Sequence, residues 1–236
     1  EYVANADAEG VVVGLSGGID SSLTSTLCVK ALGKTRVIGL GLPCGSNPKD
    51  LNDAKLLAAQ LGIEFIILDL SSVYEEFLRL TSSSLKSNNL ATANLKARLR
   101  MTTWYFVSQS MGNYLIGGTG NRTELAIGYF TKYGDGGIDF EPIGGLYKCE
   151  VRFIANKLNI PEGIINKPPS AGLWEGQTDE GEIGMKYDEL DEIIYRIDYG
   201  LSIDDLDIDK VKKVKDMIRL AEHKNKMPPM YKIFKQ

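Results

Sequence analysis

Residues 11–22 read VVVGLSGGIDSS, an apolar run that passes through glycines into a segment with helical spacing. A short, continuous apolar run is typical of a strand that is buried on both faces of a parallel sheet. Over residues 21–32 the apolar side chains fall on one helical stripe, and Gly33 follows as a stop signal. The stretch therefore predicts a strand at residues 11–15, a glycine turn and a helix, in that order.

The same strand and helix unit recurs along the chain, which predicts a parallel sheet. Further strands are expected at residues 37–42, 64–70 and 114–117, and further helices at residues 50–61, 91–111, from about 122, 151–158, 187–199 and 207–224. Three segments without either period are expected to be loops, at residues 82–87, 129–146 and 167–184. The predicted fold class is α/β, a Rossmann-like doubly wound parallel sheet in a single domain over residues 1–236.

Composition excludes several classes of function. The net charge of −4 disfavours a general nucleic-acid surface, which normally carries a basic field. No apolar run approaches the roughly 20 residues that a membrane-spanning helix needs, and the first residues lack a secretion signal. Cys28, Cys44 and Cys149 form no CxxC pair, so we expect reduced thiols. These features predict a soluble, cytoplasmic protein that binds neither nucleic acid nor membrane.

The glycine turn after the first strand has the context of a phosphate site. In parallel sheets such a turn points backbone N–H groups of a helix start at an anion. Neither GxxxxGK[ST] nor GxGxxG is present, so a Walker loop and a dinucleotide-reading turn are both unsupported. Hydroxyls of Ser16, Ser21 and Ser22 can hold a pyrophosphate, and Asp20 can offer an oxygen to Mg²⁺. The alternative is structural, with Gly17 and its neighbour turning the chain and the serines capping the helix.

The complete string SGGIDSS resembles the signature of the ATP-pyrophosphatase superfamily, which cleaves ATP to AMP and pyrophosphate. The resemblance implies an adenine nucleotide alpha hydrolase-like fold. It also implies ATP binding by Gly14, Leu15, Ser16, Gly17, Gly18, Ile19, Asp20 and Ser21. The superfamily contains enzymes with different acceptors, so this loop alone leaves the acceptor open.

Four further stretches, at residues 94–101, 118–124, 131–137 and 168–180, resemble the ammonia-dependent NAD synthetase family. The resemblance implies that ATP adenylates the nicotinate carboxylate of deamido-NAD and that ammonia then displaces AMP. A homodimer is implied as well. The family usually has one or two helices before the first strand, so we expect an N-terminal helical part to precede Glu1. A tRNA-modifying relative and an ATP-sensing regulator without turnover are the competing hypotheses.

The resemblance also implies roles for individual residues. Asp20 and Glu124 are expected to bind Mg²⁺, and alanine at either position is expected to abolish turnover with little loss of folding. Further ATP contacts are expected from Thr119, Lys148 and Ser170. Deamido-NAD contacts are expected from Arg98, Lys132, Asp139, His223 and Lys224. Asp20 and Lys148 are candidate catalytic residues, as are Asp135 and Asp179, which lie in glycine-rich loops and are candidates for deprotonating ammonium or contacting metal.

Each of these roles has a plainer alternative. Glu124 can interact with a helix dipole, as can His223, and Lys148 can be a solvated lysine. Arg100 is a close rival to Arg98. The long loops at residues 82–87 and 167–184 are expected to order around substrates and exclude water.

Free ammonia is the expected nitrogen source. The chain has no room for the glutaminase domain that some NAD synthetases carry. Cys44 and Cys149 could serve as glutaminase nucleophiles only with an activating base, and His223 is the sole histidine. A separate glutaminase partner stays an open alternative.

Overall fold

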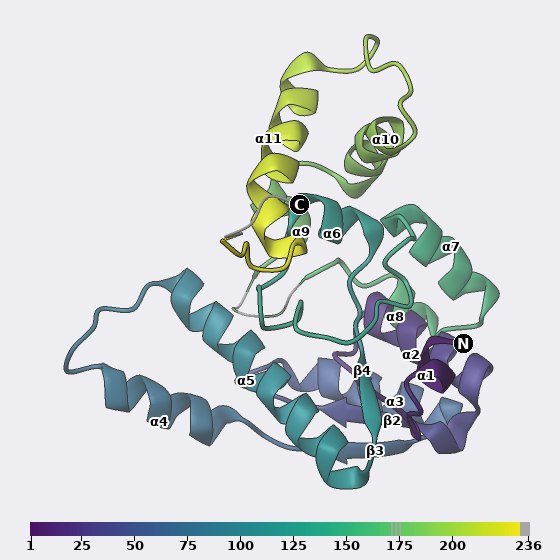
Figure 1. Cartoon of the computed structure of the whole chain (residues 1–236), viewed down its shortest axis with the longest axis vertical. Coiled ribbons are helices and arrows are strands. Elements are labelled where there is room, and N and C mark those ends of the chain that lie inside the picture. The colour runs from purple at the N-terminus through teal and green to yellow at the C-terminus, as the bar shows by residue number, and fades with distance from the viewer. Residues whose placement is uncertain (171, 173, 175, 232–236) are drawn as a thin grey trace.

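The computed structural model describes residues 1–170, 172, 174 and 176–231 of the 236-residue chain. Its sheet has four parallel strands, β3-β2-β1-β4, with bounds Gly10–Gly14 (β1), Val37–Gly41 (β2), Glu64–Ile67 (β3) and Tyr114–Gly117 (β4). Val11 lies opposite Val37 on one side and Leu115 on the other. The chain moves outward from β1 to β3 and then returns to place β4 beside β1 (Figure 1). The gap between β1 and β4 is therefore a topological switch point, where ligands of such sheets bind.

The helices of the described residues are distributed over the whole chain. They are α1 (Tyr2–Asn5), α2 (Ile19–Leu32), α3 (Pro48–Leu61), α4 (Ser71–Thr81), α5 (Asn89–Met111), α6 (Arg122–Ile127), α7 (Lys148–Lys157), α8 (Glu162–Ile165), α9 (Asp179–Ile183), α10 (Tyr187–Asp198) and α11 (Ile208–Asn225), with a 3-10 turn at Lys34–Arg36. None of them is long and apolar enough to span a membrane, among the residues described.

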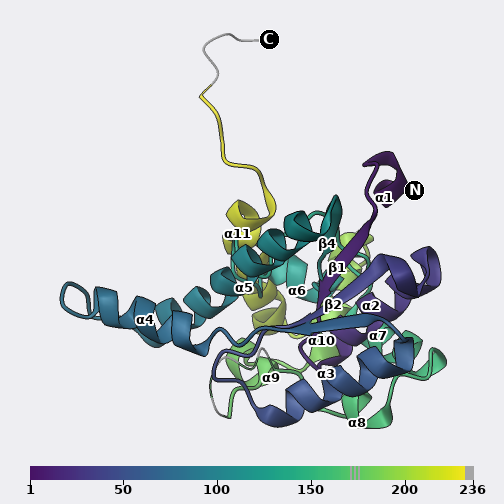
Figure 2. The same cartoon turned by 90° about the horizontal axis from the view of Figure 1, so that it is seen from below.

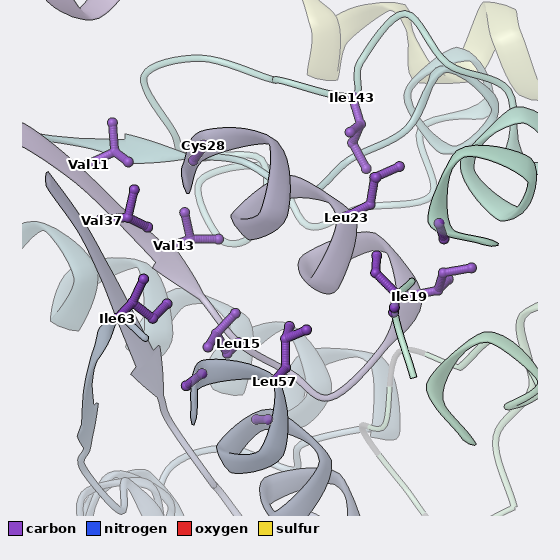
Figure 3. Close-up of a cluster of buried hydrophobic side chains, with 14 of the residues drawn as sticks. Val11, Val13, Leu15, Ile19, Leu23, Cys28, Val37, Leu57, Ile63 and Ile143 are labelled. Atoms are coloured by element: carbon purple, nitrogen blue, oxygen red, sulfur yellow. The ribbon is translucent and has the colours of Figure 1, made fainter. Parts of the chain in front are cut away.

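Alternation along β1 divides the core between the two faces of the sheet. Val11 and Val13 point into a cluster with Leu23 of α2 and Leu57 of α3, which Figure 3 shows in close-up. Val12 points the other way, into the cluster that α5 covers. Helices thus lie on both faces (Figure 2), and the predicted α/β doubly wound sheet is confirmed.

A third cluster joins α6 to the helices of the C-terminal part. Tyr187, Leu190 and Ile194 of α10 pack with Val214 of α11 and Ile127 of α6. In Figure 1, α10 and α11 stand above the carboxyl ends of the strands, with α6 beneath them. The C-terminal helices therefore lie at the same edge of the sheet as the glycine turn after β1 and the turn after β4.

Several predicted boundaries are wrong in instructive ways. The third strand ends at Ile67, because Asp69 accepts the N–H of Ser71 and turns the chain into α4. The loop expected at residues 167–184 contains α9, which Thr178 caps through Gly181 N. Its residues 171, 173 and 175 lie outside the described residues. The short helices α1 and α8 are not predicted from the sequence, and neither is α4, of which no residue is buried.

Candidate active site

The glycine turn after β1 leads directly into α2. Gly17 has φ +79°, and a Cβ there would lie 2.2 Å from the carbonyl oxygen of Asp50, so only glycine fits. Ser22 Oγ donates to Gly18 O at 2.7 Å, and the hydroxyls of Ser16 and Ser21 lie 3.0 Å apart. No side chain caps α2, so the structural alternative in which the serines cap it is wrong. The N–H groups of its first turn are available to an anion.

A second glycine turn, after β4, lies beside the first. It ends at Asn121, whose side chain accepts the N–H of Glu124 at 3.0 Å and caps α6 in a capping box. The same Asn121 donates its Nδ2 to Asp20 Oδ1 at 2.9 Å. Because β1 and β4 are neighbours, their turns bring Asp20 and Glu124 to one place.

Lys148, at the start of α7, fills the space between these two carboxylates. Its Nζ lies 2.6 Å from Asp20 Oδ2 and 3.0 Å from Glu124 Oε1, and the residue is 1% exposed. Burial opposes its charge, but the two carboxylates outweigh burial and raise the pKa of Lys148. Burial raises the pKa of Glu124 to about 7, with Asp20 adding to the rise and Lys148 opposing it. The plainer reading of Lys148 as a solvated lysine is wrong.

Tyr187 and Asp179 extend this cluster, and Tyr187 is a site residue that the sequence patterns miss. The Tyr187 hydroxyl is within 3.3 Å of Glu124 Oε1 and 3.1 Å of Asp179 Oδ2. Its ring lies under Lys148 Nζ, 4.9 Å from the centroid. Burial, followed by the charges of Glu124 and Asp179, raises the pKa of Tyr187, which keeps the phenol protonated. Only its place at the start of a predicted helix could have drawn attention to it.

A small opening beside Glu124 is lined by Thr119, Asp135 and Glu141 together with Tyr129. Asp135 accepts the N–H of Thr131 at 2.9 Å. Glu141, also missed from the sequence, accepts the N–H of Gly120 at 3.1 Å, and burial raises its pKa to about 8. Two of the predicted residues, Thr119 and Asp135, are thus brought to the carboxylate cluster.

The residues predicted to bind the dinucleotide form a second group. Arg98 is exposed on α5, with Nη2 3.4 Å from Lys132 O, and Lys132 Nζ donates to His223 O. Lys224 Nζ donates to Gly128 O and Phe130 O, both at 2.7 Å. The end of α11 therefore meets the loop after α6 and the exposed face of α5.

Arg100 and Asp139 have structural partners instead. Arg100 donates to Leu42 O at 3.1 Å and to Ser46 Oγ at 3.2 Å, which ties α5 to the segment after β2. Burial lowers its pKa. Asp139 Oδ2 accepts the N–H of Ile116 at 2.7 Å and Oδ1 accepts the Tyr105 hydroxyl at 2.9 Å. The bonds of Asp139 fasten its segment to β4 and α5, which gives Asp139 an anchoring role. The bonds of Arg100 leave Arg98 as the more exposed of the two arginines.

Ser170 lies on the exposed segment after α8, next to Pro169, whose carbonyl oxygen accepts the N–H of Asp179 at 3.0 Å. The Oγ of Ser170 accepts the N–H of Gly172. A residue that the sequence patterns miss, Lys167, reaches the phosphate turn from the same segment. Its Nζ donates to Gly17 O at 2.9 Å and to Asp50 Oδ1 at 2.7 Å, and lies 2.6 Å from Asp53 Oδ2. The phosphate turn is therefore held from two sides, by α3 and by residue 167.

Comparison with known proteins yields one consistent family. The family model described as NAD synthase matches residues 1–228. A protein described as NH(3)-dependent NAD(+) synthetase from Methanosarcina acetivorans is 46% identical, covering 99% of this chain and 96% of its own. A relative with the same description from Methanocaldococcus jannaschii is 45% identical, covering 97% and 91%.

Solved structures agree with these relatives in fold. An NMN synthetase from Francisella tularensis has a TM-score of 0.87 at 36% identity, covering 98% of this chain and 92% of that chain. An NH3-dependent NAD synthetase from Campylobacter jejuni has a TM-score of 0.83 at 34% identity, with the same coverage. Both similarities extend over the whole sheet and its flanking helices.

Proposed function

The chain belongs to the NAD synthase family, and from this we propose that it amidates deamido-NAD with ammonia at the expense of ATP, giving NAD, AMP and pyrophosphate. One structural observation supports the proposal independently of family membership. Two carboxylates, Asp20 and Glu124, converge from neighbouring glycine turns beside the uncapped start of α2. That arrangement suits a metal-bound triphosphate, because the anion and its counter-ion are held at the same edge of the sheet.

The donor set supports Mg²⁺ as the metal. Mg²⁺ prefers oxygen ligands and is commonly held by one or two carboxylates together with substrate phosphates. Asp20 and Glu124 already share one cation, the ammonium group of Lys148. No larger cluster of acidic, histidine or cysteine side chains is placed for a metal within the described part of the chain. We therefore expect the phosphates to supply the remaining ligands, and the metal to offset their charge.

The first chemical step joins the two substrates. A nicotinate carboxylate oxygen attacks the α-phosphorus of ATP, the bond from that phosphorus to the bridging oxygen breaks, and pyrophosphate leaves. The N–H groups at the start of α2 bind the phosphates, and Lys148 supplies a buried positive charge beside them. Thr119 and Ser170 are proposed as further ATP contacts, from the turn after β4 and the segment after α8.

The second step replaces AMP by nitrogen. Ammonia attacks the carbonyl carbon of the mixed anhydride, the bond to the AMP oxygen breaks, and one proton leaves the nitrogen. Asp179 shares the hydroxyl of Tyr187 with Glu124, and Asp135 lines the same small opening as Glu124. Both are proposed to accept protons from ammonium. Burial raises the pKa of Asp179, which makes this carboxylate a better proton acceptor than an exposed one.

We place the acceptor on the cationic group formed by Arg98, Lys132, His223 and Lys224. Three of these side chains carry permanent positive charge, which an anionic dinucleotide requires from a protein of net charge −4. Asp139 orders the end of β4 beneath this group through Ile116 and Tyr105. Its proposed contribution to acceptor binding is therefore indirect.

The Francisella tularensis structure supports a second candidate acceptor. That protein is described as an NMN synthetase and has the higher of the two TM-scores quoted above. An enzyme of this fold can therefore amidate a mononucleotide. Comparing kcat/KM for deamido-NAD and nicotinate mononucleotide distinguishes the two, and we expect deamido-NAD to be preferred.

We propose a homodimer built on the arm formed by α4 and the start of α5. The arm projects from the body of the molecule in both views (Figures 1 and 2). Val73, Phe77 and Leu80 of α4 are 52%, 45% and 70% exposed, although their spacing places them on one helical stripe. An exposed apolar stripe of this kind favours a partner, and the implied partner is a second copy.

A cytoplasmic location, where the free cysteines stay reduced, accords with the proposed reaction.

The decisive assay incubates the protein with deamido-NAD, ATP, Mg²⁺ and ammonium. We expect NAD, AMP and pyrophosphate in equal amounts, and the same rate with glutamine only if a separate glutaminase is added. A folded protein that forms neither NAD nor AMP would refute the proposal. AMP without NAD would indicate that the carboxylate is activated and that the nitrogen donor is another compound.

A further inference from the structure

Asp191 of α10 is a buried carboxylate that is not among the proposed ATP, metal or deamido-NAD contacts. It is 5% exposed, and both of its oxygens accept hydrogen bonds from other helices. The hydroxyl of Thr123 donates to Oδ1, and the N–H of Cys149 donates to Oδ2 at 2.8 Å. Thr123, which is fully buried, accepts in turn the N–H of Lys148 at 3.2 Å. Asp191 is thus linked to the first turns of both α6 and α7.

These two first turns carry the groups that bind at the site. Thr123 directly precedes Glu124 in α6, and Cys149 directly follows Lys148 in α7. The N–H groups at a helix start lack intrahelical partners, and a carboxylate beside them is stabilised by the helix dipole. Asp191 and Thr123 therefore satisfy α7's first N–H groups and hold the start of α6 against them.

Most other buried residues of α10, Tyr187 excepted, have a different task. These residues, among them Leu190, Ile193 and Ile194, pack apolar surface in the cluster that α6 and α11 share. Apolar packing fixes how closely helices approach, but it leaves rotation and sliding along the helix axes poorly determined. Directional bonds from one carboxylate to two helix starts remove that freedom.

We propose that Asp191 is a positioning residue which, through Thr123, sets the separation of Glu124 from Lys148 and so the geometry of the metal and phosphate site. The inference rests on the proposed function, since it assigns the metal to Asp20 and Glu124. It gives the C-terminal helices a role in the chemistry at the sheet edge. Residues that orient metal ligands from behind typically contribute about 10- to 100-fold in metal affinity.

The test compares variants that differ by single groups. Thr123→Val keeps the shape of the side chain but removes the hydroxyl, which leaves Asp191 Oδ1 and Lys148 N–H without partners. Thr123→Ser keeps the hydroxyl and is the conservative rescue. Asp191→Asn places an amide N–H₂ toward one of two donors. Ile194→Ala, in the same helix and fully buried, lowers stability through a cavity without touching the hydrogen bonds.

The principal readout is calorimetric binding of Mn²⁺ in the presence of ATP, measured well below the Tm of every variant. We expect Thr123→Val and Asp191→Asn to weaken Mn²⁺ binding by about tenfold or more. Thr123→Ser and Ile194→Ala should stay within about threefold of the unaltered protein. The apparent KM for Mg²⁺ in NAD formation should rise in parallel for the first two variants.

Two outcomes would overturn the inference. If Thr123→Val and Asp191→Asn lower Tm as Ile194→Ala does but bind Mn²⁺ normally, Asp191 merely stabilises the fold. If the unaltered protein with ATP binds no Mn²⁺, the metal assignment fails and the inference fails with it. Normal Mn²⁺ binding by a protein that forms no NAD would instead refute the proposed function and leave the positioning role intact.

Discussion

Lys148 Nζ lies 2.6 Å from Asp20 Oδ2, although 128 positions separate the two residues in the chain. Glu124 completes the arrangement on the other side of the same ammonium group. A lysine buried between two carboxylates is stabilised only as long as all three charges are present, because each compensates for the loss of water around the others. The cluster therefore stabilises the fold and is also the proposed ligand site. Variants of its residues should change both the stability of the protein and its activity.

Replacement of Lys148 by methionine tests the shared charge. The variant leaves two carboxylates close together without their cation, which we expect to cost about 3–5 kcal/mol of unfolding free energy and to abolish NAD formation. Mg²⁺ or Mn²⁺ should raise the Tm of Lys148→Met more than that of the unaltered protein, since the metal replaces the missing charge. Equal metal-induced shifts in both proteins, measured by scanning fluorimetry, would contradict this account.

Alanine at Glu124 should reduce stability as well as activity, contrary to the expectation from sequence. The side chain completes the capping box of α6 and is one of two partners of Lys148. Loss of such a cap costs about 1 kcal/mol, to which the uncompensated lysine adds. Glu124→Gln keeps the cap and the shape, so it should lose turnover with a smaller drop in the midpoint of urea unfolding. A common midpoint for both variants would argue against the cap.

Lys167→Met should weaken ATP binding while leaving the chemical step largely intact. Lys167 holds Gly17 O and the acidic side chains of α3, so its loss frees the phosphate turn. A charged hydrogen bond contributes roughly 1.5–3 kcal/mol, which corresponds to a rise in the KM for ATP of about tenfold or more. The exposed Lys212→Met is the matched control. A fall in kcat at unchanged KM would place Lys167 in the reaction itself.

Alkylation of Cys149 should be slow at neutral pH and accelerate in the Asp191→Asn variant. Burial and then the charge of Asp191 raise the pKa of Cys149 to about 11, and thiolate is the reactive form. Reaction with iodoacetamide should therefore rise about tenfold per pH unit between pH 7 and 10. Removing a negative charge lowers the thiol pKa, so Asp191→Asn should react faster at pH 8. Mass spectrometry of the modified peptide measures both rates, and unchanged rates would contradict the electrostatic effect of Asp191 on the thiol.

Charge on the α4 stripe should separate the proposed dimer. Phe77→Glu and Leu80→Glu place carboxylates at side chains that are already 45% and 70% exposed, so the fold should be retained. We expect monomers by light scattering at micromolar concentration, with an unchanged circular dichroism spectrum. Glu75→Gln, on the same helix, is the control that should stay dimeric. If the unaltered protein is monomeric at all concentrations, the assignment of the arm is wrong.

Most of the architecture was within reach of sequence patterns, and the misses have physical causes. Apolar runs such as residues 11–13 and the glycine stop at Gly33 are local signals, and they predicted strands and a helix end well. α4 carries no buried residue, and of its side chains the partly buried Tyr74 packs against the core, so the core specifies little of this helix. β3 ends before the turn at Asp69, where the carboxylate accepts the N–H of Ser71. A run of apolar residues does not reveal such a hydrogen bond.

The amino-acid sequence by itself predicted the phosphate turn, because strand, glycine turn and helix start are contiguous in residues 11–22 and can be recognised without reference to any distant residue. The family resemblance likewise paired Asp20 with Glu124 as metal ligands and marked Lys148 as an ATP contact. Only the tertiary structure decided that these three share one charge cluster, that Tyr187 and Asp191 support it, and that Lys167 holds the phosphate turn. The reason is that a parallel sheet gathers the carboxyl ends of β1 and β4 at one edge, so groups far apart in the chain meet there. Burial at this edge then shifts their pKa values, and the fold pairs them with residues that no local pattern identifies.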